Sequence, residues 1–341
     1  MQVSEQAMSL HQRAILVDGH NDSIIEHWAR GDSMDLTPDW PDYQVDLRRM
    51  KGGGLTAMNS MMGGQSLDQS LELWDGLYEQ VEAHPEHYMI VRSVADIRRC
   101  KEEGKIGHIP QLESCRLLGN SLRVLHIQHR LGLRVGNLTH GDGGGTSLQG
   151  TNSLFGPCTL QDRNTARTQF HGLTDFGREA IAEMNRLGIV VDLAHTHDRT
   201  FFDALEVTTT PVEFSHGCCF SLCPVWRNLT DEQLKALAEN GGVIGICFYP
   251  RFLELNADTV PIDRLVDHIA HVCEVAGEDH VGFGSDYDGI GETVATPASF
   301  LESPQVTQRM LERGFSEELI LKFWGGNFMR VLQAAEDAAQ A

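Results

Sequence analysis

The sequence predicts a single (β/α)8 barrel of the TIM type, in the α/β class. Short apolar segments bounded by glycine, proline or polar residues recur along the chain, and most are followed by a stretch with helical periodicity. About eight such units within 341 residues favour a closed barrel over an open doubly wound sheet. No G-x-G-x-x-G motif follows the first apolar segment, so the open, dinucleotide-binding alternative lacks its main support.

Eight apolar segments are predicted as the barrel strands. They cover residues 14–20, 54–61, 106–113, 133–140, 188–195, 211–216, 241–249 and 280–288. Apolar residues spaced three and four apart predict helices over residues 67–83, 174–188, 230–242 and 262–277. The second and third of these helices open with Thr-Asp, a typical N-cap signal.

The pattern continues without an internal repeat, low-complexity tract or linker, so residues 1–341 are expected to form one domain. The long glycine-rich connection "THGDGGGTSLQGTNSLFGPC" begins at Thr139. A loop after a barrel strand lies on the catalytic face, and loops of this length are usually functional or mobile. The sequence leaves the role of residues 141–150 open.

Charge and composition narrow the classes of partner. The chain has 48 acidic and 27 basic residues and a formal net charge of −21, which would repel nucleic acid and anionic membranes. No export signal is visible, and apolar runs such as residues 241–249 are shorter than the ~18 residues of a membrane helix. We therefore expect a cytoplasmic protein whose eight cysteines are reduced thiols, without a structural zinc site.

The first predicted strand carries three titratable side chains. Asp18, His20 and Asp22 are spaced two apart, so on a strand they face the same side as Leu16. Burial of charged groups without partners is costly. The period of two therefore favours a functional role for His20 and Asp22.

Most of the other predicted strands also end in a residue that can bind a metal or transfer a proton. These residues are Glu113, His140, His195, His216, Asp286 and Asp288. Active sites of barrels collect at the C-terminal ends of the strands, so these side chains are expected to converge. A lone histidine is more often structural, but imidazoles and carboxylates together are the ligands of zinc and similar ions. The set predicts a metal site with two divalent ions and a bridging carboxylate.

Two positions need a choice between neighbours. His195 shares a strand face with Val191 and Leu193, whereas His197 lies beyond the strand and is expected to cap the next helix or support the site. Some dinuclear sites use a carbamylated lysine as the bridge, but none of the five lysines ends a predicted strand. Glu113 is therefore the natural bridging ligand.

The motifs resemble the membrane (renal) dipeptidase family of zinc metallopeptidases, within the amidohydrolase superfamily. The resemblance runs from Asp18 to Leu332 and rests on the order and spacing of several motifs. These are "VDGHND", "LTH", "GLTDFGREAIAEMNRLGIVVDLAH", "PVEFSH", "RNLTDEQLKALAENGGVIGICFYP", "VGFGSDYDG" and "GGNFMRVL".

The resemblance implies a role for each site residue. His20, Asp22 and Glu113 would hold one zinc ion, and Glu113, His195 and His216 the other. His140 and Arg227 would bind the substrate, and Asp286 would be the catalytic aspartate. His140 would also stabilise the oxyanion, and the planar fork of Arg227 suits a free α-carboxylate. Strand alternation does not separate Asp286 from Asp288, so that choice rests on the resemblance.

The implied activity is hydrolysis of dipeptides that have a free C-terminal carboxylate, with a D-residue accepted at that end, by a hydroxide held between the two ions. The partner is then a small molecule, and a homodimer is compatible with the sequence.

Two departures from the family concern the substrate: Ser114 and Cys115 replace the glycine that usually follows the bridging glutamate, and "GDGGGTSLQG" replaces the usual loop. They leave open an amidase for an N-acyl amino acid, a lactam or a pathway-specific intermediate. A catalytically silent binding protein is the third hypothesis, against which the full ligand set argues.

Overall fold

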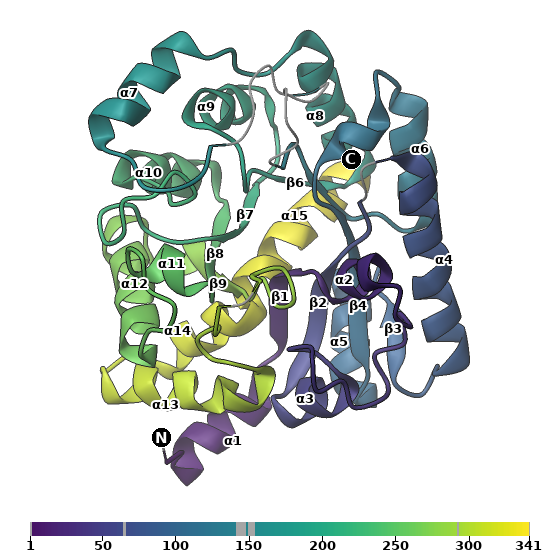
Figure 1. The fold of residues 1–341 in the computed structure, drawn as a ribbon, viewed down its shortest axis with the longest axis vertical. Coiled ribbons are helices and arrows are strands. Elements are labelled where there is room, and N and C mark those ends of the chain that lie inside the picture. Colours follow the sequence, from purple (N-terminus) through teal and green to yellow (C-terminus); the bar gives the residue numbers. More distant parts are fainter. Residues whose placement is uncertain (1, 64–65, 141–147, 149–153, 292, 341) are drawn as a thin grey trace.

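The computed structural model contains a nearly closed barrel of eight parallel strands surrounded by helices (Figure 1). It describes residues 2–63, 66–140, 148, 154–291 and 293–340. In order around the barrel, the strands are β1 (Leu16–Asn21), β2 (Leu55–Met61), β4 (Ile106–Leu112), β5 (Val135–Asn137), β6 (Val190–Asp192), β7 (Glu213–Gly217), β8 (Val243–Cys247) and β9 (Val281–Gly284). The predicted (β/α)8 barrel and its eight strands are confirmed, whereas the assignment of residues 1–341 to one domain stays a prediction.

One strand was not predicted. β3 (Tyr88–Ile90) has three residues and pairs with β4 outside the barrel path. A segment this short carries too few residues for alternation to be visible, so its pairing depends on the neighbouring strand.

The four predicted helices are confirmed as α4 (Leu67–Ala83), α8 (Asp175–Leu187), α10 (Asp231–Asn240) and α12 (Ile262–Val275). Thr174 is the N-cap of α8 and Thr230 that of α10: their hydroxyls accept hydrogen bonds from the backbone N–H groups of Gly177 and Gln233, respectively. The remaining α-helices are α1 (Glu5–Arg13), α2 (Ser23–Arg30), α3 (Leu47–Gly52), α5 (Val94–Glu103), α6 (Leu122–Leu131), α7 (Leu160–Gln169), α9 (Asp198–Val207), α11 (Pro250–Leu253), α13 (Ser303–Glu312), α14 (Glu317–Leu321) and α15 (Asn327–Gln340). Within the described ranges, no helix has the length and apolar character needed to cross a membrane.

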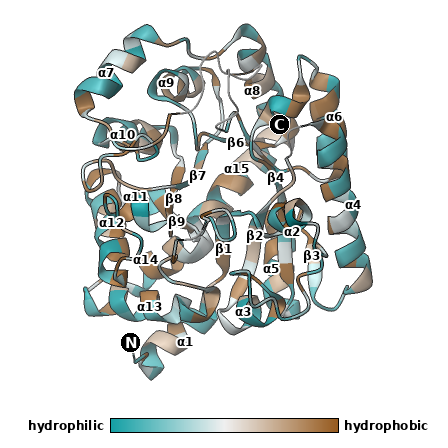
Figure 2. Cartoon of the chain, viewed as in Figure 1, coloured by the Kyte–Doolittle hydropathy of each residue, from teal (hydrophilic) through white to brown (hydrophobic). Residues whose placement is uncertain are grey.

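Helix α15 closes the N-terminal end of the barrel. It crosses behind the strands and contacts β1, β6, β8 and β9 (Figure 1). Figure 2 shows hydrophobic residues on the barrel strands and on this helix. The ring of Phe328 in α15 packs against Gly19 and Gly282. A Cβ at these positions would lie 2.5 and 2.6 Å from the ring, so only glycine leaves room for it. The apolar plug leaves the opposite, C-terminal end of the barrel for polar residues.

A buried hydrogen-bonded pair joins the first and last strands. The carboxylate of Asp18 accepts hydrogen bonds from the Ser285 backbone N–H at 2.6 Å and from its hydroxyl at 2.5 Å. Next to this pair, the backbone N–H of Asp286 donates to the carbonyl of His20 at 3.1 Å. Burial raises the pKa of Asp18 to about 6, and the hydrogen bonds from Ser285 oppose that rise. Asp18 is therefore a structural residue that closes the barrel beside His20.

Ser285→Ala removes the hydroxyl that donates to the buried Asp18 carboxylate. We expect the free energy of unfolding to fall by about 1 to 3 kcal/mol, because a buried acceptor loses a partner. Urea unfolding followed by circular dichroism measures the change. Ser299→Ala is the control, since that serine makes no capping hydrogen bond through its side chain. Equal stability of the two variants would contradict the role given to Asp18.

Candidate metal centre and active site

The predicted site residues lie at the C-terminal end of the barrel. His20 lies in β1, one residue before the strand ends at Asn21, and Asp22 is the N-cap residue of α2. His216 lies in β7, whereas Glu113, His140, His195 and Asp286 follow the ends of β4, β5, β6 and β9. The structure brings together His20, Asp22, Glu113, His140, His195, His216, Arg227 and Asp286, either by direct contact or around one cavity.

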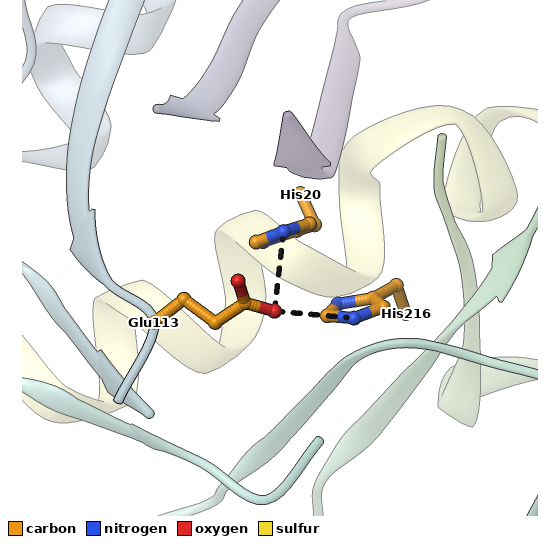
Figure 3. Close-up of side chains that lie close together, drawn as sticks. All are labelled: His20, Glu113 and His216. Atoms are coloured by element: carbon orange, nitrogen blue, oxygen red, sulfur yellow. Dashed lines mark ion pairs between the residues drawn. The ribbon is translucent and has the colours of Figure 1, made fainter. Parts of the chain in front are cut away.

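Glu113 is at the centre of this cluster. Its Oε1 lies 3.5 Å from the Nε2 of His20, 2.9 Å from that of His195 and 3.5 Å from that of His216. Figure 3 shows this oxygen between the rings of His20 and His216. The same Nε2 of His20 lies 3.4 Å from Oδ1 of Asp22. Glu113 thus contacts imidazoles from β1, from the end of β6 and from β7, and the rings of His20 and His216 also stack, with centroids 4.1 Å apart.

The residues fit a divalent metal. His20 Nε2 and Asp22 Oδ1 are buried and have no hydrogen-bond partner among the residues that the structure describes. Such atoms are costly unless a bound group satisfies them. Among the described residues, three groups have ligand atoms within 4.8 Å of one another, namely His20, Glu113 and His216; Glu113, His140 and His195; and His20, Asp22 and Asp286. Imidazole and carboxylate together are a ligand set of zinc.

The pKa values in the cluster reflect both burial and the charged groups that lie close together in it. Burial alone lowers the pKa of His20, but Glu113 and Asp22 more than offset this and raise it well above its ordinary value. Burial lowers the pKa of His195 and His216 well below the ordinary value, so both rings are neutral and offer a lone pair. Burial opposes ionisation of Glu113, but the cationic groups around it lower its pKa. The cluster thus combines an ionised carboxylate with imidazole nitrogens.

Several site residues have backbone conformations that a strand pattern does not predict. His195 and Asp286 have φ values of 65° and 59°, and both lie beyond the ends of β6 and β9. His195 therefore does not reach the cluster by sharing a strand face with Val191 and Leu193, as strand alternation predicted. Its side chain reaches the cluster from a residue beyond the strand. Ser114, which follows Glu113, has φ 70°, in the region that favours glycine.

The two candidate aspartates point to different places. Asp286 lines the cavity, and its Oδ1 lies 4.0 Å from His20 Nε2. Burial raises its pKa to about 7, which suits proton transfer. Asp288 instead accepts a hydrogen bond from the backbone N–H of Gln44 at 2.6 Å. The geometry therefore favours Asp286 for contact with a substrate.

Glycine at position 289 allows the carboxylates to approach one another. A Cβ at Gly289 would lie 2.0 Å from Oδ2 of Asp22 and 2.8 Å from Oδ1 of Asp286. Any larger residue would push these two side chains away from the cluster.

Arg227 faces the same cavity. It is only 3% exposed, and its Nη2 donates to the carbonyl of His216 at 3.3 Å. Its Nε and Nη1 have no hydrogen-bond partner within the described part of the chain. The cavity has a volume of about 460 Å³, and its walls include the aromatic side chains of Phe155, Tyr249 and Phe252. A buried guanidinium with two nitrogens that have no partner suits an anionic group such as a carboxylate.

Comparison with known families decides the class of protein. The family model described as Membrane dipeptidase (Peptidase family M19) matches residues 4–341. The chain belongs to the membrane dipeptidase family. Membership confirms the resemblance seen in the motifs and makes the chain a metal-dependent hydrolase that acts on peptide bonds.

Named relatives in this family are dipeptidases. Dipeptidase tcpJ of Claviceps purpurea (strain 20.1) is 32% identical over 344 residues, which cover 94% of this chain and 77% of tcpJ. Dipeptidase aclJ of Aspergillus oryzae is 30% identical over 355 residues, covering 96% and 80%. A metallopeptidase from Rhodobacter sphaeroides, crystallised with a phosphinate mimic of the dipeptide L-Ala-D-Ala, is 25% identical with a TM-score of 0.85, covering 94% of this chain and 99% of that chain.

Other sequence-based expectations have mixed outcomes. His197 is the N-cap of α9 and accepts a hydrogen bond from the Arg199 N–H, as expected for a capping residue. Apart from Leu148, residues 141–150 lie outside the described residues, so their role stays open. Sequence reasoning missed the polar side chains behind the ligands, although polar residues inside otherwise apolar strands were a signal. These are Gln111, Asn137, Asp192 and Ser215.

Glu113→Gln tests the bridging role, because it preserves the size of the side chain and removes its charge. We expect the metal content to fall from about two ions per chain to one or fewer, measured by elemental analysis after dialysis against zinc. Glu213→Gln is the matched control. Burial raises the pKa of Glu213 well above its ordinary value and favours the neutral acid, so its variant should keep the native content. Unchanged metal content in Glu113→Gln would contradict the bridging assignment.

Proposed function

We propose that this chain is a dinuclear zinc dipeptidase that hydrolyses dipeptides with a free C-terminal carboxylate. The observation that carries the proposal is the buried Arg227, which lines the same cavity as Glu113 and Asp286 and whose Nε and Nη1 have no hydrogen-bond partner among the described residues. A metal centre and a carboxylate-binding group on one cavity fit a short peptide cleaved next to its C-terminal residue.

In this proposal His20, Asp22 and Glu113 would hold one zinc ion, and Glu113, His195 and His216 would hold the other. When bound, the two ions supply Lewis-acid polarisation of the amide carbonyl and an attacking water that is acidic enough to react at neutral pH. The distances of the three imidazole nitrogens to one oxygen of Glu113 support this shared role.

The chain's own residues supply the remaining steps. His140 lies beside His195, with ring centroids 4.5 Å apart, and lines the cavity, so it is placed to donate a hydrogen bond to the developing oxyanion. Asp286 takes the proton of the attacking water and delivers it to the leaving amine, a role that its raised pKa supports. Arg227 holds the carboxylate of the C-terminal residue and so fixes the position of the scissile bond.

Two cavities flank the cluster, which supports a substrate of two residues. The first, of about 460 Å³, contains Arg227, and the second, of about 370 Å³, includes Ile25, Trp28 and Met61. Both are lined by Asp22 and Glu113. We assign the C-terminal residue to the first cavity and the N-terminal residue to the second. The relative that binds a mimic of L-Ala-D-Ala supports acceptance of a D-residue at the C-terminal position.

An amidase for N-acyl amino acids is the second candidate. The apolar side chains of Ile25, Trp28 and Met61 in the second cavity favour it, because they would also hold an acyl chain. A panel of L,L- and L,D-dipeptides together with N-acyl amino acids separates the two functions. A homodimer and a cytoplasmic location stay predictions from the sequence.

Arg227→Met tests recognition of the carboxylate. We expect KM to rise and kcat/KM to fall about 30-fold or more, equivalent to ~2 to 5 kcal/mol for a desolvated ion pair. Amidation of the substrate's C-terminus should cause a similar loss in the native enzyme, and the two losses should not add. Arg251→Met is the control, because Arg251 lies at the same cavity but is exposed and paired with Asp258. Equal hydrolysis of acid and amide substrates would favour the second candidate.

Asp286→Asn tests the proton transfer. We expect it to retain both metal ions and to lower kcat about 100-fold or more, since the amide cannot accept the proton. Asp288→Asn is its partner experiment and should stay active, because Asp288 bonds to the backbone of Gln44. Steady-state kinetics with metal analysis measure both. An inactive Asp288→Asn beside an active Asp286→Asn would reverse the assignment.

A further inference from the structure

We propose that Asp192 is a positioning residue that fixes which ring nitrogen His20 and His216 present to the metal centre. The carboxylate lies behind the cluster on β6, is fully buried, and reaches each histidine through one intervening side chain. The proposal rests on the metal site of the proposed function and goes beyond it, because it makes one carboxylate responsible for both halves of the centre.

The first connection runs through Gln111 to His20. The Nε2 of Gln111 donates to Oδ2 of Asp192 at 2.9 Å, and its Oε1 lies 2.8 Å from Nδ1 of His20. The carboxylate accepts the amide's N–H, so the amide oxygen must face the histidine. His20 therefore carries a proton on Nδ1, and its Nε2 faces Asp22 and Glu113.

The second connection runs through Ser215 to His216. The Ser215 hydroxyl donates to Oδ2 of Asp192 at 2.6 Å, and its Oγ lies 2.9 Å from Nδ1 of His216. A hydroxyl has one hydrogen, which is used on the carboxylate, so Oγ accepts the Nδ1 proton of His216. The lone pair of His216 then lies on Nε2, the atom 3.5 Å from Oε1 of Glu113.

Other donors hold the carboxylate in place. Its Oδ1 accepts the backbone N–H groups of Ala194 and Ser215, each at 2.9 Å. Asn137 donates to Oδ2 at 3.3 Å and to the carbonyl of Ala194 at 2.6 Å. Because N–H groups only donate, these contacts make Asp192 an acceptor. As the shared acceptor, it sets the donor and acceptor roles of Gln111 and Ser215 toward the two histidines.

The same asparagine extends the network to the loops that carry two further site residues. Its Oδ1 accepts the N–H of Ser114, which follows Glu113, at 3.2 Å and the N–H of Thr139, which precedes His140, at 2.9 Å. Asp192 and Asn137 together therefore connect the C-terminal ends of β1, β4, β5, β6 and β7.

Single-connection variants separate positioning from a purely structural role. Ser215→Ala removes the acceptor for His216 alone, and Gln111→Met removes the acceptor for His20 alone. Asp192→Asn changes both connections. Gln111 and Ser215 donate to Oδ2 of the native carboxylate, and an amide NH2 at that position could not accept their hydrogen bonds. Ser215→Thr keeps a hydroxyl and should restore native behaviour. Asp46→Asn is the control for loss of a buried carboxylate elsewhere, since Asp46 caps α3.

The experiment titrates the purified full chain with zinc against a competing chelator, which gives an affinity for each ion. We expect Ser215→Ala and Gln111→Met each to weaken a different single ion by about 10- to 100-fold, and Asp192→Asn to weaken both. Nitrogen-15 NMR of the histidine rings should show a changed tautomer for His216 in Ser215→Ala and not in Ser215→Thr.

The outcomes are distinct from those that test the dipeptidase. Native affinity for both ions in Ser215→Ala and Gln111→Met would overturn the proposal, as would an equal loss of both ions in each of them, even if Asp192→Asn failed to fold. One outcome would support this inference and contradict the proposed function. In it, the wild type binds two ions and each single-connection variant loses affinity for a different one, but the wild type hydrolyses no dipeptide.

Discussion

The contact of Glu113 with three imidazole rings is the interaction on which the active end of the barrel depends. The rings belong to the ends of β1, β6 and β7, which are distant in sequence and meet only because the sheet closes. Closure in turn uses the buried pair of Asp18 and Ser285, which joins β1 to β9 directly beside His20. A small change in barrel closure would therefore change the distances within the metal centre.

The two ends of the barrel have opposite physical characters. At the N-terminal end, Phe328 and the apolar residues of the strands form a core beside Glu213, whose pKa burial raises. At the other end, carboxylates and imidazoles gather around cavities that admit a substrate. The stable apolar half offsets the cost of burying charged groups in the other half.

Membership of the membrane dipeptidase family and the geometry of the cavities agree on a small substrate with two ends. Arg227 supplies cationic N–H groups on one side of the cluster, and the apolar walls near Trp28 lie on the other. The polar network behind the ligands, from Gln111 through Asp192 to Ser215, adds a reason why the histidines present the same nitrogen to the centre.

The sequence alone determined the (β/α)8 architecture and the strand ends that carry the site, because strand and helix periodicities are local and the C-terminal ends of barrel strands always meet. Tertiary structure decided the direction of each side chain beyond a strand. His195 and Asp286 adopt positive φ, so alternation no longer applies to them, and Asp288 turns toward Gln44. The network around Asp192 was equally hidden, because its hydrogen bonds join five strands whose separation in sequence says nothing of their distance in space.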